Sequence, residues 1–354
     1  MYKKFFMGIA AMAALTLVSC SSEDLNSLSD NSSKNEAISF DGYWGRSAVS
    51  VNGSRGSVIN NAEDLQKVAE GFGVFGNYTA AAGNTPTYGN NWFDNQKVTY
   101  ETSAWTYSPV KYWLPQGHID FLAYAPYDSN QKLNDNSKLN FTVSSTVTDQ
   151  KDLLWANAKN QTKDNIASTN NKVKFKFDHA LSRLGYTVKL KDAYTGTTIK
   201  LTKITLAGSS DGTKEAFYTT GTIDLSKTSS TGLWTTSTTA AKQKFDWFSG
   251  TQTLAATTDY NNPNTDYLFV IPQKFSAQAT DQLYVIVEYT IEGPEGVTTP
   301  MKNTVYKQLE KNFEQGKAYT INLTIGLTPI EFDVDVVTGW DPADGTPIEF
   351  DSWN

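Results

Sequence analysis

The chain has 354 residues, a formal net charge of −7, two histidines and one cysteine. It has no basic patch that would recruit a nucleic acid, and a lone cysteine excludes both an internal disulfide and a thiolate metal site. Aromatic residues make up 13% of the chain and charged residues only 19%, and the many aromatic and Thr residues favour β-strands, so we expect an all-β protein of about two domains.

Residues 1–19 have the composition of a secretory signal. A pair of lysines precedes the apolar run 5–18, which is shorter than the about 20 residues of a membrane-spanning helix. The run ends in LVSC at 17–20, which resembles the bacterial lipobox, where the cysteine thiol is acylated after cleavage. We therefore predict a lipoprotein signal peptide and a lipid (palmitate) on Cys20, with an unpaired buried cysteine as the alternative.

Residues 20–37 connect this signal to the rest of the chain. They are rich in Ser, Asn and Asp and poor in apolar residues, which is typical of a flexible tether. The acidic pair Glu23-Asp24 resembles the surface-export tag of Bacteroidetes lipoproteins. We therefore expect an outer membrane lipoprotein that is exposed at the cell surface.

Residues 38–165 are expected to form a first β-sandwich domain. Apolar and polar residues alternate in 37–51, which predicts its first strand. A short helix is predicted at 60–67, because an Asn at its start can cap it and acidic residues follow in its first turn. Further strands are expected at 72–76, 98–103, 112–114, 121–126 and 152–156. The polar segment 157–171 has the composition of a linker.

Residues 172–340 are expected to form a second β-sandwich domain. The segment 173–177 alternates cleanly between apolar and charged residues, which predicts its first strand. Further strands are expected at 186–191, 198–207, 268–272, 282–291 and 319–325. In the last strand, three apolar residues share one face: Phe332, Val334 and Val336.

The hexapeptide TPIEFD occurs twice near the end of the chain, at 328–333 and 346–351, with a turn-forming DPADG between the copies. Residues 341–354 are not needed to close the second domain, so they are a candidate donor strand for the sheet of another molecule. Two alternatives stay open: the tail folds back as a hairpin on its own domain, or both copies swing out together as the donor. The second copy has three candidate anchors: Ile348, Phe350 and Trp353.

Six short motifs follow one another along the chain. They are WLP at 113–115, FLAYAP at 121–126, DLL at 152–154, FDHALSRL at 177–184, IPQ at 271–273 and GKAY at 316–319. In this order, and behind a lipobox, they resemble the fimbrillin-like (Mfa-like) family of Bacteroidetes surface lipoproteins, which includes subunits of type V pili. The resemblance extends over about 40–340.

This resemblance implies a fold, a mode of assembly and partners. The fold would be two tandem Greek-key, transthyretin-like β-sandwiches. An Arg-specific protease would remove the N-terminal segment with its first strand, and the emptied groove would accept a strand from the next subunit. The partners would be other fimbrial subunits, and the outer membrane before processing, so that the processed protein resides in a fimbrium and contributes to cell adhesion. Shaft, tip and anchor positions all stay open.

The arginines add an observation from the residues themselves. The chain has only three, and Arg46 and Arg55 lie where a removable first strand would meet the domain. Arg55 is the better candidate for processing, because it lies between Ser54 and Gly56 in a turn-rich stretch. Ordinary surface arginines are the alternative. Arg183 lies in a shared motif, and we expect it to be packed and to resist cleavage.

Nothing in the sequence indicates an enzyme. His118 and His179 belong to no cluster, and no spacing predicts a catalytic set, a cofactor or a metal site. The competing interpretation is a monomeric surface lipoprotein that binds a host glycan or protein ligand through exposed aromatics, against which stands a role of these aromatics in the cores. The aromatics are Tyr88, Trp92, Trp105, Tyr107, Tyr112 and Trp113, and then Trp234, Phe245, Trp247 and Phe248.

Overall fold

The computed structural model describes most of the chain from Ala37 onward. The described residues are 37–44, 59, 61–81, 91–237, 239–263, 266–293, 299–326, 331–336 and 348–349. The chain divides into two units, residues 1–35 and 36–354, and every described element lies in the second. Among these elements there is one short α-helix and otherwise strands and short 3₁₀ turns, so the all-β prediction is confirmed.

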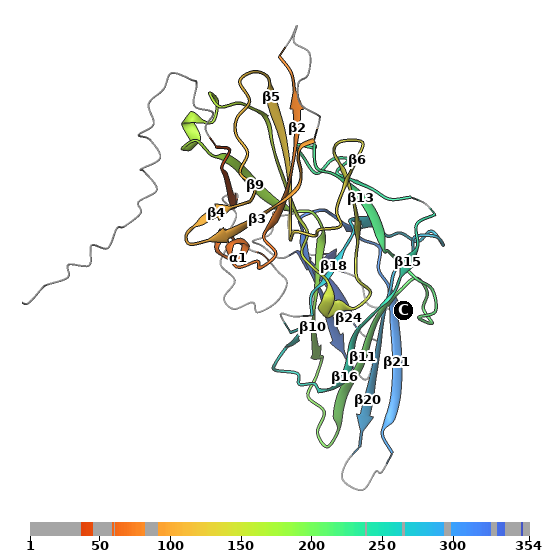
Figure 1. Ribbon diagram of the computed structural model, residues 1–354. Helices are drawn as coiled ribbons and strands as arrows, with labels where there is room; N and C mark the ends of the chain where they lie inside the picture. Colours follow the sequence, from red (N-terminus) through yellow and green to blue (C-terminus); the bar gives the residue numbers. More distant parts are fainter. Residues whose placement is uncertain are drawn as a thin grey trace, which may run out of the picture. The chain divides into compact units, whose positions relative to one another are not determined.

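The first half of the chain builds a seven-stranded sheet in the order β1-β9-β8-β5-β2-β3-β4 (Figure 1). Its buried face is dominated by phenylalanine, because apolar residues alternate with polar ones along several of its strands. All pairings in it are antiparallel except that of β1 with β9. The strands are β1 (Phe40–Trp44), β2 (Phe72–Thr79), β3 (Asn91–Glu101), β4 (Ala104–Thr106), β5 (His118–Ala125), β8 (Leu154–Gln161) and β9 (Val173–His179).

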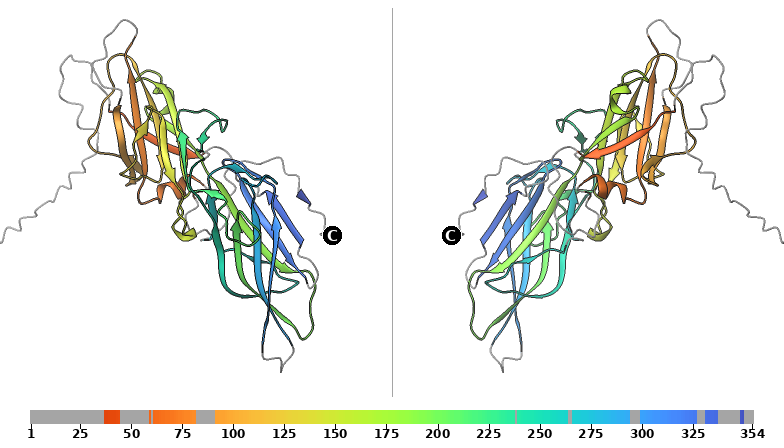
Figure 2. Two further views of the ribbon diagram at one scale, coloured as in Figure 1. Left: turned by 90° about the vertical axis from the view of Figure 1, so that its right-hand side faces the viewer. Right: turned by 90° about the vertical axis from the view of Figure 1, so that its left-hand side faces the viewer.

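The second half builds two sheets that share one hydrophobic cluster (Figures 1 and 2). One sheet has the order β17-β10-β23-β24-β25, with β18 also paired to β10, and the other has the order β16-β11-β20-β21. The strands of the first are β10 (Ser182–Leu190), β17 (Tyr260–Asn261), β18 (Leu268–Val270), β23 (Ala318–Ile325), β24 (Glu331–Val336) and β25 (Ile348–Glu349). Those of the second are β11 (Thr198–Ala207), β16 (Phe245–Thr253), β20 (Tyr284–Glu292) and β21 (Met301–Gln308).

Several short strands complete the fold. A four-stranded sheet, β14-β13-β7-β6, joins the two halves, because β7 of the first half pairs with β13 of the second. Two further pairs are β12 with β15 and β19 with β22. Their bounds are β6 (Leu133–Asn134), β7 (Lys138–Thr142), β12 (Phe217–Tyr218), β13 (Thr220–Asp224), β14 (Trp234–Thr235), β15 (Lys242–Gln243), β19 (Gln273–Lys274) and β22 (Asn312–Phe313).

The helix prediction at 60–67 is confirmed by α1 (Ala62–Gln66). Asn61 caps it, since its side-chain oxygen accepts a hydrogen bond from the Asp64 amide at 2.8 Å. The strand predicted at 112–114 is wrong. Tyr112 makes only an isolated bridge to Ala37, and Pro115 has no amide hydrogen with which to extend a ladder.

The predicted linker 157–171 begins inside a strand, because β8 continues to Gln161 and pairs with β5. The next strand, β9, was expected to open the second domain, yet it pairs with β1 and β8 in the sheet of the first half. The chain passes from this sheet to the next at Ala180-Leu181, between β9 and β10. Polarity alone suggested a linker because β8 ends in polar, partly exposed residues.

Candidate functional site

Strand β1 lies at the edge of the seven-stranded sheet and has a single partner strand. It pairs with β9 in parallel, from Phe40 opposite Val173 to Trp44 opposite Phe177. A strand held by one ladder can leave without breaking any other strand pairing in the sheet. Strand β1 is therefore the most easily removed member of this sheet's long strands.

The apolar face of β1, together with Ile38 just before the strand, fills an aromatic pocket. Ile38 and Phe40 are each only 1% exposed. The Phe40 ring lies 5.3–5.6 Å, centroid to centroid, from four other rings. These rings belong to Phe93, Tyr107, Phe121 and Phe175. The pocket comes from four separate chain segments and would be open and apolar without β1.

Position 42 sets how closely the strand approaches the sheet. A Cβ on Gly42 would lie 3.2 Å from the Leu65 side chain of α1 and 3.3 Å from the Phe177 ring, which is tighter than usual contact. Tyr43, the next residue, is 41% exposed. The strand thus presents one buried face and one face toward solvent.

The main chain around β1 is also held by hydrogen bonds. The Tyr107 hydroxyl donates to the Ile38 carbonyl at 2.7 Å, and the Ile38 amide donates to the Lys111 carbonyl at 2.8 Å. The Val173 amide donates to the Ser39 carbonyl at 2.8 Å. Burial raises the pKa of the Tyr107 hydroxyl, which keeps it in the protonated form that donates. These bonds involve only the backbone of the inserted strand, so another strand in the same register can make them.

The next described residue after Trp44 is Ile59, and a buried carboxylate binds its amide. The Ile59 amide donates to the Asp152 carboxylate at 3.1 Å, and Asp152 is fully buried. The His179 ring nitrogen Nδ1 lies 2.9 Å from the same carboxylate oxygen, Oδ2, and 3.0 Å from the other oxygen, Oδ1. His179 and Asp152 together therefore have a structural role, because they connect the chain at Ile59 to the end of β9. Its own carbonyl accepts a hydrogen bond from Gln315.

Of the three arginines, only Arg183 is among the described residues. Arg183 is only 6% exposed and its guanidinium lies 4.5 Å from the centre of the Tyr267 ring, which confirms that it is packed. Burial lowers its pKa. Arg46 and Arg55, like Cys20, lie outside the described residues.

The candidate donor strands lie in the second half, where β24 and β25 end the sheet order β17-β10-β23-β24-β25. In β24, Phe332, Val334 and Val336 are opposite Leu323, Ile321 and Tyr319 of β23. Ile348 of β25 is opposite Val334, so part of the second TPIEFD copy pairs with the first. Of the three arrangements considered for the tail, this pairing has the form of the folded-back hairpin. Phe350 and Trp353 lie outside the described residues.

Four of the nine described aromatics proposed to bind a glycan are core residues. Trp105, Trp113, Phe245 and Trp247 are at most 9% exposed, which contradicts a binding role for their faces. The remaining described members are half-buried, except Tyr112, which is 50% exposed. Sequence alone could not separate the two roles, because the same aromatic residue types occur in buried and in exposed positions. Tyr88 lies outside the described part.

The described residues contain no group of three His, Cys, Asp or Glu side chains that could hold a metal ion. His118 is the first residue of β5 and is half-buried. Within the same part of the chain, no helix is both long and apolar enough to cross a bilayer.

The comparisons with known proteins agree with this architecture. The fimbrillin-like family model matches residues 60–340. A curated relative, the fimbrium subunit Fim1C of Phocaeicola vulgatus, is 26% identical over 213 residues, which cover 54% of this chain and 53% of the relative. The aligned part of the chain thus spans about half the length of this relative.

A solved structure with a similar fold is a fimbrial protein of Bacteroides vulgatus. The TM-score is 0.61 at 22% identity, and the match covers 86% of this chain and all of that one. At this identity the similarity establishes the fold.

Proposed function

Because the chain belongs to the fimbrillin-like family, we propose that it is a fimbrial subunit that is exported as a lipoprotein through Cys20 and assembles by strand exchange. The observation that carries the proposal is β1, an edge strand with one partner strand and a fully buried apolar face. Both processing candidates, Arg46 and Arg55, lie between Trp44 and Ile59 in the sequence.

Cleavage between β1 and Ile59 would change how β1 is held. Burial of the Ile38 and Phe40 side chains stabilises the docked strand by about 1.5–3 kcal/mol each. In the uncut chain the strand docks within one molecule, and its effective concentration is high. After cleavage, the binding of the separate β1 segment is opposed by the entropy that it loses on association. The modest burial of its side chains then leaves it only weakly bound. The aromatic pocket is then available to another strand.

The second TPIEFD copy has a sequence suited to this pocket. Ile38-Ser39-Phe40-Asp41 of the first strand and Ile348-Glu349-Phe350-Asp351 of the tail share three of four residues, with Ile and Phe at the same spacing. Alternate residues of a strand lie on the same face, so Ile348 and Phe350 would replace Ile38 and Phe40. This similarity supports residues 341–354 as the donor.

The first TPIEFD copy carries the same Ile-Glu-Phe-Asp at 330–333. Its residues Glu331–Asp333 lie in β24, which pairs along six residues with β23, whereas the described part of the second copy, Ile348–Glu349, pairs along two residues with β24. Moving β24 out would expose Val334, which is 1% exposed. The second copy is therefore the less costly donor, and β24 with its anchors Phe332, Val334 and Val336 is the structural member of the pair.

Processing and polymerisation test the proposal together. Treatment of the purified protein with an Arg-specific protease should release the segment that contains β1, and mass spectrometry should locate the new N-terminus after Arg55 or Arg46. The processed protein should form ladders that resist SDS on gels. The Arg46→Ala/Arg55→Ala double variant should remain uncut and monomeric. A processed protein with an intact tail that stays monomeric would contradict strand exchange.

A further inference from the structure

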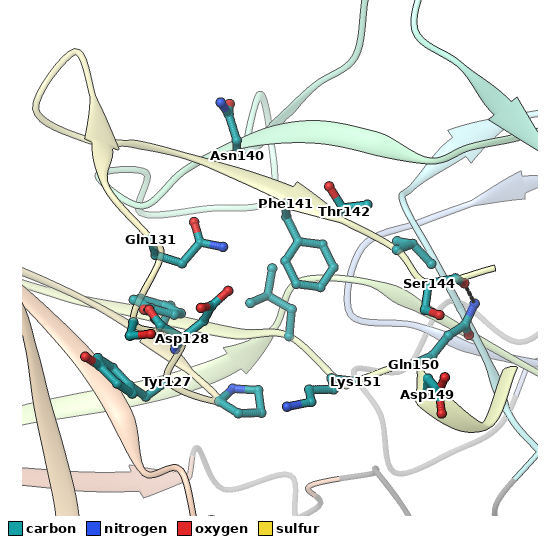
Figure 3. Close-up of a pocket in the computed structure, with 15 residues that line it drawn as sticks. Tyr127, Asp128, Gln131, Asn140, Phe141, Thr142, Ser144, Asp149, Gln150 and Lys151 are labelled. Carbon is teal, nitrogen blue, oxygen red and sulfur yellow. Dashed lines mark hydrogen bonds between the residues drawn. The ribbon is translucent and has the colours of Figure 1, made fainter. Parts of the chain in front are cut away.

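A cavity of about 510 Å³ opens beside β7 (Figure 3). Three separate segments line it: the turn after β5, strand β7, and the 3₁₀ turn Val147–Asp149 with the residues after it. Its size lies within the about 300–1,000 Å³ of small-molecule sites. Neither β1 nor the tail contributes to its lining, so the strand-exchange proposal leaves it unexplained.

The cavity combines aromatic rings with polar groups. Phe141 and Tyr127 are half-buried, and Figure 3 shows the Phe141 ring extending into the cavity with the Gln131 amide turned toward it. The side chains of Gln131 and Asp149 make no hydrogen bond within the described part of the protein. They are a donor–acceptor amide and an acceptor carboxylate that are available to a ligand.

Asn140 precedes Phe141 on β7 and therefore lies on the opposite face of the strand, where its side-chain oxygen accepts a hydrogen bond from the Thr222 hydroxyl at 3.0 Å. One further polar group of the cavity, Asp128, is held in place by the fold. One oxygen of the Asp128 carboxylate accepts a hydrogen bond from the Asn130 amide at 2.9 Å. The Asp128 carbonyl accepts a hydrogen bond from the buried Tyr124 hydroxyl at 2.8 Å, which fixes the turn. A site whose polar groups are fixed before binding loses less entropy when a ligand docks.

The charges around the cavity disfavour an anion. Asp128 and Asp149 each contribute a negative charge to the lining, and Lys151 contributes the one positive charge. The Lys151 ammonium already pairs with the Glu70 carboxylate at 3.2 Å, so its charge is largely compensated. A phosphate, sulfate or carboxylate would therefore meet a net negative surface.

From these features we propose that the cavity binds a neutral saccharide. The C–H face of a pyranose ring is apolar and packs on an aromatic ring such as that of Phe141. Its hydroxyl groups both donate and accept, which matches the amide of Gln131 beside the carboxylates of Asp128 and Asp149. A purely apolar ligand would leave these polar groups desolvated and unpaired. This function is additional to strand exchange and does not depend on it.

Saturation-transfer NMR and calorimetry on the purified protein test the proposal with four probes: maltose, lactose, chitobiose and sialyllactose. At least one of the neutral disaccharides should bind, and lactose should bind more tightly than sialyllactose, which adds a carboxylate to it. Gln131→Ala should weaken binding about tenfold, since it removes one hydrogen-bonding side chain. Phe141→Leu should weaken it at least as much, because it removes the ring but keeps an apolar side chain.

Matched controls lie outside the cavity. Gln278→Ala removes an exposed amide, and Tyr306→Leu removes a ring that is 48% exposed on β21, so both should bind like the wild type. Melting temperatures identify any variant that fails to fold, and Gln131→Ala is the safer of the two, because Phe141, unlike Gln131, is one of the hydrophobic residues packed against the larger hydrophobic cluster. Three results would overturn the proposal: no binding of a neutral disaccharide, binding unchanged in both cavity variants, or tighter binding of sialyllactose than of lactose.

Discussion

At the residue scale, Phe40 is the side chain that the aromatic pocket is built around. Phe40→Ala should destabilise the unprocessed protein by about 3–5 kcal/mol, because it leaves a cavity among four rings. Urea denaturation followed by tryptophan fluorescence measures this loss. Tyr43→Ala is the control on the exposed face of the same strand and should cost much less. Equal losses in the two variants would show that the pocket contributes little.

Asp152 governs a different step, since it holds the chain immediately after the candidate cleavage sites. Removing its carboxylate in Asp152→Ala should cost about 3–5 kcal/mol, because His179 and the Ile59 amide lose a buried partner. Hydrogen exchange at the Ile59 amide should accelerate, and proteolysis should trim the new N-terminus beyond Ile59. Asp164→Ala, at an exposed site, should change neither. Unaltered exchange at Ile59 in Asp152→Ala would contradict this role.

A third residue links stability to alkaline pH. Burial raises the pKa of Tyr319 to about 12, and its hydroxyl accepts a hydrogen bond from the Glu314 amide at 3.0 Å. A folded-state pKa above the unfolded value of about 10 gives a stabilisation that is complete below pH 10 and is lost as pH rises toward 12. The free energy of unfolding should therefore fall above pH 10, and Tyr319→Phe should reduce the slope. An identical slope in this variant would exclude Tyr319 as a contributor.

At the element scale, the sequence predicts faces better than it predicts neighbours. The alternation in Val173–Phe177 correctly indicates a strand, but period two says only which side chains share a face. It does not say that β9 takes β1 as a parallel partner, or that β7 pairs with β13 across the two halves. The cavity was missed for a related reason. Its lining comes from separate turns and a strand, and no periodic pattern brings such segments together.

Also at this scale, the similarity between β1 and the tail can be tested without assembly. Ser39→Glu converts the Ile-Ser-Phe-Asp of the first strand into the Ile-Glu-Phe-Asp of the tail. Ser39 is half-buried and lies between the two inward-facing residues. The free energy of unfolding of the variant should therefore lie within about 1 kcal/mol of the wild-type value. Phe40→Glu, which puts a charge into the pocket, should be far less stable. If Ser39→Glu is equally damaging, the tail sequence does not suit the pocket.

At the scale of the whole molecule, the loss of β1 should affect the two hydrophobic clusters unequally. Ile38 and Phe40 belong to the cluster of the first half. The larger cluster contains the cores of the second half together with Phe75, Leu122 and Trp155 from the first, and no residue of β1. Removing β1 should therefore loosen one cluster and leave the other packed. If the subunit assembles by strand exchange as proposed, it would then remain folded until a donor strand binds.

A synthetic peptide of residues 344–354 should fill the emptied site of the processed protein. Hydrogen exchange of the processed protein should be fast in β9 and in the β5 segment near Phe121, slow in β20 and β23, and slow throughout after the peptide is added. The peptide should also shorten the SDS-resistant ladders, since it occupies the pocket but carries no further subunit. A peptide with Phe350→Ala should do neither, because it lacks the ring that replaces Phe40. If both peptides leave exchange and ladders unchanged, the donor must be another segment, whereas protection of β9 by the first peptide alone would assign the tail to this pocket.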